Sequence, residues 1–216
     1  MSVIRHMALD KGFAVSFVVL SREVPMQKFE MVYREMVRQL RVSEHSNPKD
    51  THQGIRSLLD TWVWNFHREG DPSVSLGDEG LLEEKLRMTD ENLRALEGME
   101  SNFANGLISL LENRWKPLQE GETEDDRTAA RELLYRWFEG EKVAKKELKP
   151  FQIFDSLNKT NSKRLFSSLV AFLRYLGYKG LVLLLDELES VLGVGACPVN
   201  WPIASGAWCG RSCREA

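Results

Sequence analysis

The segment Leu181-Val-Leu-Leu-Leu-Asp186-Glu187 decides the fold class of this 216-residue chain. Its five aliphatic residues predict a strand buried on both faces, as the strands of parallel sheets are. Two adjacent carboxylates follow directly. Because ligands of open α/β sheets bind at the carboxyl ends of the strands, this order is typical of a Walker B element. The segment alone leaves open the alternative of a plain buried strand followed by a solvated acidic loop.

The two carboxylates have distinct roles in the Walker B interpretation. Asp186 holds Mg²⁺ through a water molecule, because Mg²⁺ keeps much of its hydration shell. Glu187 orients or deprotonates the water that attacks the γ-phosphate of ATP. The partner motif, Gly-x-x-x-x-Gly-Lys-Ser/Thr, does not occur in the 216 residues, so no cofactor-binding residue is assigned. We expect the phosphate loop to lie upstream of Met1, which makes this chain a fragment with little activity of its own.

A second apolar run, Phe13–Leu20, also predicts a buried parallel strand. Before it, apolar residues at helical spacing predict the last turns of a helix that ends at Gly12. A polar loop is predicted over 42–51. Thr123, followed by three acidic residues, predicts a helix N-terminus. The spacing of apolar residues predicts helices within 29–40, 55–66, 79–118, 130–138 and 162–176.

Together these elements predict an α/β fold with one ATPase domain at residues 1–192. Its core is a partial P-loop NTPase core of AAA-like type, with parallel strands and a large, mostly helical insertion at about residues 45–160. Residues 193–216 have no periodicity and contain all three cysteines, Cys197, Cys209 and Cys213. We interpret them as an atypical tail that is disordered or out of frame.

The composition excludes several classes of protein. Hydrophobic residues make up 43% and charged residues 28% of the chain, which is typical of a globular protein rather than a disordered one. The net charge of −3 argues against nucleic-acid binding through bulk positive charge, although it leaves a local patch open. No apolar run approaches the roughly 20 residues of a membrane helix. Since no cysteine precedes Cys197, we expect a cytoplasmic protein without a disulfide framework and without a membrane partner.

A short basic run has two interpretations. Its four lysines are Lys142, Lys145, Lys146 and Lys149. They could contact a phosphate backbone. Because Glu141 and Glu147 dilute the charge, a solvated helix face is the favoured interpretation.

Two stretches of the chain resemble a known family. Residues 12–41 begin Gly-Phe-Ala-Val-Ser-Phe-Val-Val-Leu and are similar to the segment after the Walker A helix in the P-loop ATP-binding proteins of BREX phage-resistance systems. Residues 164–189 contain Leu-Arg-Tyr-Leu-Gly-Tyr-Lys-Gly before the apolar run and are similar to the Walker B region of that family. The resemblance covers about residues 1–192.

The resemblance implies an AAA-like ATPase with ATP and Mg²⁺ as cofactors and a role in bacterial defence against phage DNA. It implies other defence-system proteins as partners, with DNA and further copies of the chain as additional candidates. Two alternatives stay open. One is a non-enzymatic helical interaction module. The other is an AAA-like ATPase of another DNA-linked pathway, such as replication initiation or transposition, which has the same fold and the same two acids.

Overall fold

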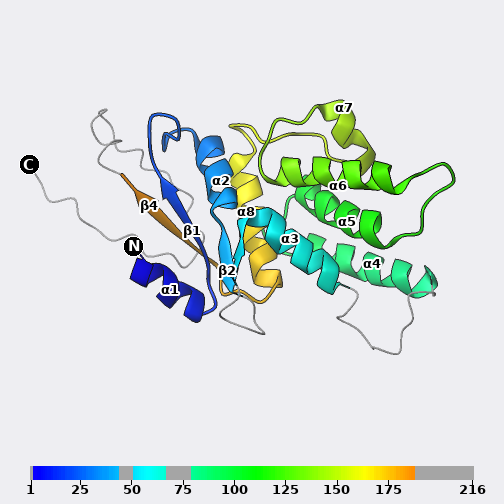
Figure 1. The fold of residues 1–216 in the computed structure, drawn as a ribbon, viewed down its shortest axis with the longest axis horizontal. Coiled ribbons are helices and arrows are strands. Elements are labelled where there is room, and N and C mark those ends of the chain that lie inside the picture. The colour runs from blue at the N-terminus through cyan, green and yellow to red at the C-terminus, as the bar shows by residue number, and fades with distance from the viewer. Residues whose placement is uncertain (1, 44–50, 67–78, 188–216) are drawn as a thin grey trace, which may run out of the picture.

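The computed structural model describes residues 2–43, 51–66 and 79–187 of the chain (Figure 1). In these ranges the helices are α1 (Ser2–Asp10), α2 (Phe29–Arg38), α3 (Gly54–Asn65), α4 (Glu79–Arg94), α5 (Ser101–Trp115), α6 (Glu124–Phe138), α7 (Lys145–Leu148), the 3-10 helix η1 (Lys149–Phe151) and α8 (Ser162–Tyr175). The strands are β1 (Ala14–Val19), β2 (Arg41–Ser43), β3 (Thr51–Gln53) and β4 (Leu181–Asp186). The expected mixed α/β character and parallel pairing are confirmed. The tail predicted at 193–216 lies outside the described residues.

The four strands form one sheet in the order β3-β2-β1-β4. β1 and β4 are parallel, and six consecutive residue pairs join them, from Ala14 with Leu181 to Val19 with Asp186. The prediction that the two apolar runs are strands is therefore confirmed. The long connection between them holds the helices α2 to α8, as a parallel crossover requires a connection of a dozen residues or more.

The sequence predicts a loop over 42–51, but the short strands β2 and β3 occupy the first and last residues of this segment. β2 is antiparallel to β1, with Val15 opposite Arg41, and β3 is antiparallel to β2. The loop prediction is wrong at these ends, while residues 44–50 lie outside the described part. Each strand has three residues, and in β2 only Val42 is apolar and buried, so neither shows an alternation that a sequence pattern could reveal. The edge of β1 supplies the hydrogen-bonding partner of β2, and the outer edge of β2 supplies that of β3.

The two faces of the sheet are covered by different helices. Figure 1 shows α1 on one side and α2 with α8 on the other. Ala14 and Val18 of β1 belong to the large core with α2, whereas Val15 packs with Ala8 and Leu9 of α1. This division follows the alternation of side chains along a strand.

The buried hydroxyl of Ser16 donates to the carbonyl of Met36 at 2.8 Å, which satisfies a polar group inside the core and ties α2 to β1.

β4 is less buried than the sequence predicts. All six of its residues are half-buried, whereas four of the six residues of β1 are buried, with Phe17 half-buried and Val19 exposed. β4 is the last strand of the sheet among the described residues, so its outer edge has no described neighbour. An apolar run therefore forms a strand at the rim of the described sheet rather than at its centre.

Glycines end the helices on either side of the strand pair. After α1, the Gly12 N–H donates to the Leu9 carbonyl and the Phe13 N–H donates to the Ala8 carbonyl. This is a Schellman motif, and it requires the positive φ of 80° that Gly12 adopts. Gly177, with φ of 89°, ends α8 in the same way. Both helix ends occur where the sequence predicts them, and both turns feed directly into the parallel strands.

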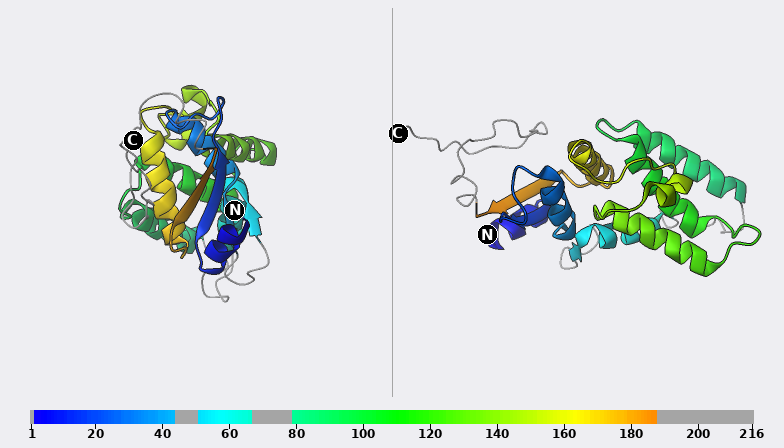
Figure 2. Two further views of the ribbon diagram at one scale, coloured as in Figure 1. Left: turned by 90° about the vertical axis from the view of Figure 1, so that its left-hand side faces the viewer. Right: turned by 90° about the horizontal axis from the view of Figure 1, so that it is seen from above.

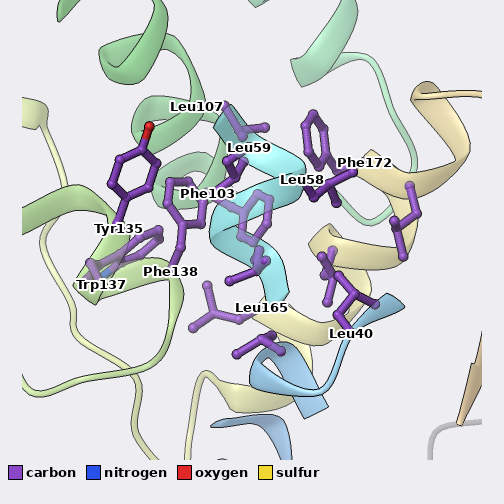
Figure 3. Close-up of a cluster of buried hydrophobic side chains, with 14 of the residues drawn as sticks. Leu40, Leu58, Leu59, Phe103, Leu107, Tyr135, Trp137, Phe138, Leu165 and Phe172 are labelled. Atoms are coloured by element: carbon purple, nitrogen blue, oxygen red, sulfur yellow. The ribbon is translucent and has the colours of Figure 1, made fainter. Parts of the chain in front are cut away.

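The helices between β3 and β4 share one hydrophobic core with the sheet. Figure 3 shows the aromatic centre of this core, where Phe103 of α5 lies between α6 and α8. The rings of Phe103 and Phe138 meet edge to face with centroids 5.0 Å apart, and Trp137 packs against Phe138 at 4.9 Å. Phe172 extends the aromatic cluster to α8, the helix that directly precedes β4 in the chain. The proposed division into a domain core and a helical insertion stays a prediction, since this core runs through both.

We predict that Phe103→Ala lowers the free energy of unfolding by about 3–5 kcal/mol, because it removes a ring with no exposed surface and leaves a cavity. Urea denaturation followed by circular dichroism measures the change. Phe154→Ala is the matched control, since 61% of the Phe154 side chain is exposed. A loss for Phe154→Ala as large as that for Phe103→Ala would contradict the assigned core.

The N-terminus of α6 supplies a second prediction. The hydroxyl and the backbone N–H of Thr123 both donate to the carboxylate of Asp126 and hold its pKa below the usual value. The Thr123 hydroxyl in turn accepts from the Asp126 N–H, which completes a capping box. We expect Thr123→Ala to cost about 1 kcal/mol at pH 7.

The pH dependence of this cost follows from the direction of the pKa shift. A carboxyl with a lowered pKa in the folded state stabilises the protein above its unfolded pKa of about 3.9 and loses that contribution as the pH falls further. The difference in unfolding free energy between wild type and Thr123→Ala should therefore shrink below about pH 4. Denaturation curves between pH 3 and pH 7 test this, with Thr123→Ser expected to match the wild type. A difference that grows on acidification would contradict the assigned cap.

Candidate functional site

The carboxyl ends of β1 and β4 lie at the same edge of the sheet, as Figures 1 and 2 show by the direction of the two arrows. Val19 and Asp186 are directly paired at that edge. The ladder continues one residue further, since the Leu20 N–H donates to the Asp186 carbonyl at 3.1 Å. The backbone of Asp186 is therefore held on one side by β1 at the carboxyl end of the strand.

The side-chain direction of Asp186 follows from the pleat. Leu183 and Leu185 pack on the large core, whereas Val182 and Leu184 pack with the α1 cluster. Asp186 continues the second series, so its carboxylate lies on the α1 side of the sheet. It is half-buried, and its Oδ1 accepts a hydrogen bond from the Glu187 N–H at 3.1 Å. The sequence prediction that an acid ends this strand is thus matched by a backbone position fixed at the sheet edge.

Glu187 adopts an unusual backbone conformation. Its φ is 59°, in the left-handed region, and its side chain is exposed. For a residue other than glycine this conformation costs about 1–2 kcal/mol. Strained residues of this kind concentrate at functional sites, where the surrounding structure holds them. The extended conformation of β4 therefore ends at Asp186, directly before Glu187.

A tight turn directly follows β1, at the same edge of the sheet. The Ser21 hydroxyl accepts hydrogen bonds from the N–H groups of Glu23 and Val24, both at 3.1 Å, and the Ser21 N–H donates to the Val24 carbonyl. The sequence analysis did not single out Ser21. A serine directly after an apolar strand and before Pro25 is the signal that could have found it, because serine hydroxyls favour such turns. The turn keeps the chain close to the edge that carries Asp186.

The donor set fits Mg²⁺ in one respect. Mg²⁺ binds proteins through one or two carboxylates and takes its remaining ligands from water and phosphate oxygens. Asp186 supplies one such carboxylate at the edge of the sheet. No group of three or more histidine, cysteine or acidic side chains that could hold a metal occurs in the described part of the chain. Asp186 therefore suits a metal that arrives with phosphate ligands better than a fully protein-ligated one.

A separate groove lies in the helical part. It has a volume of about 630 Å³ and its lining includes Leu82 of α4, Glu112 of α5 and Phe151 of η1. No residue of β1 or β4 lines it. Arg127, which is buried beside it, donates to the Pro117 carbonyl at 2.5 Å and pairs with Glu122 at 2.9 Å. These bonds fix the connection between α5 and α6, so Arg127 has a structural role there.

Comparisons with known proteins assign the chain to a family. A family model described as BREX system ATP-binding protein BrxC/D matches residues 1–197. Neither the curated proteins nor the solved structures contain a significant match. In the described ranges no helix is both long and apolar enough to cross a membrane.

We predict that the strain at Glu187 can be measured. Glu187→Gly and Glu187→Ala both remove the carboxylate, but only glycine adopts a positive φ without penalty. The glycine variant should therefore be more stable than the alanine variant by about 1 kcal/mol, as measured by urea denaturation. Equal stability of the two variants would show that residue 187 does not hold the left-handed conformation.

Proposed function

The chain belongs to the family of BREX system ATP-binding proteins BrxC/D, and from this premise we propose that it forms part of an ATP-hydrolysing P-loop site. In this proposal Asp186 binds Mg²⁺ and Glu187 activates the attacking water. The observation that carries the proposal is the parallel register of β1 and β4, which brings adjacent acids to the carboxyl edge of the sheet. That edge is where open α/β sheets bind their ligands.

Each acid has a role that its position supports. Asp186 is the residue whose backbone β1 holds, so it is suited to orient a metal-bound water with little loss of entropy. Glu187 is exposed and follows the strand directly, which gives it access to solvent water beside the metal position. Mg²⁺, when bound with ATP, neutralises charge on the phosphates. Glu187 then accepts or orients the proton of the attacking water.

The phosphate loop is the part of the site that these residues do not supply. No Gly-x-x-x-x-Gly-Lys-Ser/Thr occurs in the 216 residues. We propose that the loop is contributed by residues beyond this sequence, and that the 216-residue chain alone hydrolyses ATP poorly. An AAA-like arrangement of the sheet is part of the same proposal.

The partners follow from the family. Membership suggests other BREX components as partners. We extend the proposal to a cytoplasmic assembly that contains further copies of the chain and acts on DNA. The family favours this pathway over replication initiation or transposition, which the sequence alone left open.

The proposal is tested with acid-to-amide variants in two forms of the protein, the 216-residue chain and a form extended upstream of Met1 in its native reading frame. In the extended form Glu187→Gln should keep Mg²⁺-dependent nucleotide binding and lose about 10²–10⁴-fold in ATP hydrolysis, the usual contribution of a general base. Asp186→Asn should weaken the Mg²⁺ dependence of nucleotide binding itself. Phosphate release and fluorescent-nucleotide titrations measure the two effects.

Exposed acids elsewhere supply matched controls. Glu120→Gln and Asp125→Asn make the same chemical changes at exposed positions of the helical part and should leave both measurements unchanged. Hydrolysis that is insensitive to Glu187→Gln would reject the assigned roles. Absence of nucleotide binding in both forms would reject the ATPase and favour the helical interaction module.

A further inference from the structure

Positive charge is concentrated in one segment of this acidic chain. Residues 142–164 contain seven basic and two acidic residues, a net charge of +5, whereas the whole chain has a net charge of −3. All seven basic side chains are exposed: Lys142, Lys145, Lys146, Lys149, Lys159, Lys163 and Arg164. The segment comprises α7, η1, the loop to α8 and the first residues of α8. We call its exposed face the 142–164 surface.

Of the three carboxylates near this surface, Glu141 is paired with arginines outside the segment, whereas Glu147 and Asp155 are already counted in its net charge of +5. Glu141 pairs with Arg136 at 2.9 Å and lies 3.9 Å from Arg38. The Glu147 carboxylate accepts the Ala144 N–H at the N-terminus of α7. Asp155 pairs with Lys145 at 2.9 Å.

Several of the lysines have no such partner. Within the described ranges, Lys142, Lys146, Lys149, Lys159 and Lys163 form no ion pair. Glu141 and Glu147 therefore do not neutralise these five lysines by pairing, and the segment keeps its net positive charge.

Hydrogen bonds tie the two ends of the segment together. The Ser156 hydroxyl donates to the Val143 carbonyl at 2.6 Å, and the Asn161 amide donates to the Ser156 carbonyl at 3.0 Å. The Asn161 Oδ1 also accepts the Asn158 N–H at 2.8 Å. Lysines that are up to 21 positions apart in sequence are thus carried by one compact, cross-linked region.

Phe154 is presented on this region by a rigid loop. The backbone on both sides of it is held from the helical core: the Phe154 N–H donates to the Asn102 side chain at 3.0 Å, and the Trp137 indole donates to the Asp155 carbonyl at 2.9 Å. Ile153, directly before it, is fully buried. The phenyl ring of Phe154 is nevertheless 61% exposed. An exposed aromatic ring on an anchored loop, with Lys149 and Lys159 five positions before and after it in sequence, combines the two elements with which proteins bind single strands: a stacking platform and positive charge.

We propose that the 142–164 surface binds single-stranded nucleic acid, with the lysines contacting phosphates and Phe154 stacking on a base. Charge complementarity favours a polyanion, and the exposed ring favours one with unpaired bases over a duplex or an acidic protein. Figures 1 and 2 show α7 in the helical part, away from β4, while the first residues of α8 lie beside α2. The inference adds a nucleic-acid contact to the proposed ATPase and is independent of nucleotide binding.

The test measures binding of fluorescein-labelled dT20 DNA and U20 RNA to the 216-residue chain by fluorescence anisotropy, without ATP. We expect Phe154→Ala to weaken binding about tenfold, since stacking on one base contributes on that order, and Phe154→Tyr to retain it. Phe154→Leu should behave as the alanine variant does. Lys146→Gln with Lys149→Gln should make the slope of log K against log salt shallower by about 1.4, because each lost phosphate contact removes about 0.7.

Lys11→Gln with Lys179→Gln is the charge-matched control, because both lysines are exposed and lie on the connections beside β1 and β4. It should leave the affinity and the salt slope unchanged. Four results would overturn the proposal: no binding of either probe, equal binding by Phe154→Ala, tighter binding of a 20-base-pair duplex, or equal competition by poly-glutamate. Since ATP is absent throughout, none of these results bears on Asp186 and Glu187.

Discussion

The parallel register between β1 and β4 is the constraint on which the rest of the structure depends. Six consecutive residue pairs place Val19 opposite Asp186, so both strands end at one edge. A slip of one residue would exchange the two faces of β4, because side chains alternate along a strand. Asp186 would then face the large core, and Leu185 would leave it. The hydrophobic pattern that builds the core is therefore the same pattern that sends the acidic residues to the sheet edge.

The helical part stabilises this edge through the shared core. Ser16 of β1 is bonded to α2, and α2 packs on α8, which leads through Gly177 into β4. The same core continues into α5, α6 and α8 through the rings of Phe103, Phe138 and Phe172.

The loop that carries Phe154 is in turn anchored on α5 and α6. The candidate metal site and the 142–164 surface thus rest on the same packed core.

Local signals predict the fold well where the determining interactions are local. Apolar runs locate β1 and β4, and Thr123, Gly12 and Gly177 locate helix ends because capping depends on neighbouring backbone groups. β2 and β3 escape sequence analysis because β2 becomes a strand by pairing with β1, which is distant in sequence, and β3 becomes one only by pairing with β2.

The candidate site likewise has one feature that the sequence predicts and others that it does not. The position of Asp186 at the end of a strand is predictable from the apolar run, but the left-handed turn at Glu187 is not, since no glycine or asparagine marks it. The half-burial of β4 depends on which neighbours its outer edge has. The exposure of Phe154 is likewise set by distant residues, Asn102 and Trp137, whose bonds orient the loop. Sequence patterns report the propensity of a segment, whereas these features depend on what packs against it.

Paramagnetic broadening by Mn²⁺ and ATP in the extended form tests the central claim most directly, because Mn²⁺ replaces Mg²⁺ and broadens NMR signals only near its site. The account predicts that the amide signals of Leu20, Asp186 and Glu187 are lost first and that those of the groove beside Arg127 persist. Broadening centred on the groove residues Glu112 and Glu122, with Asp186 unaffected, would contradict it.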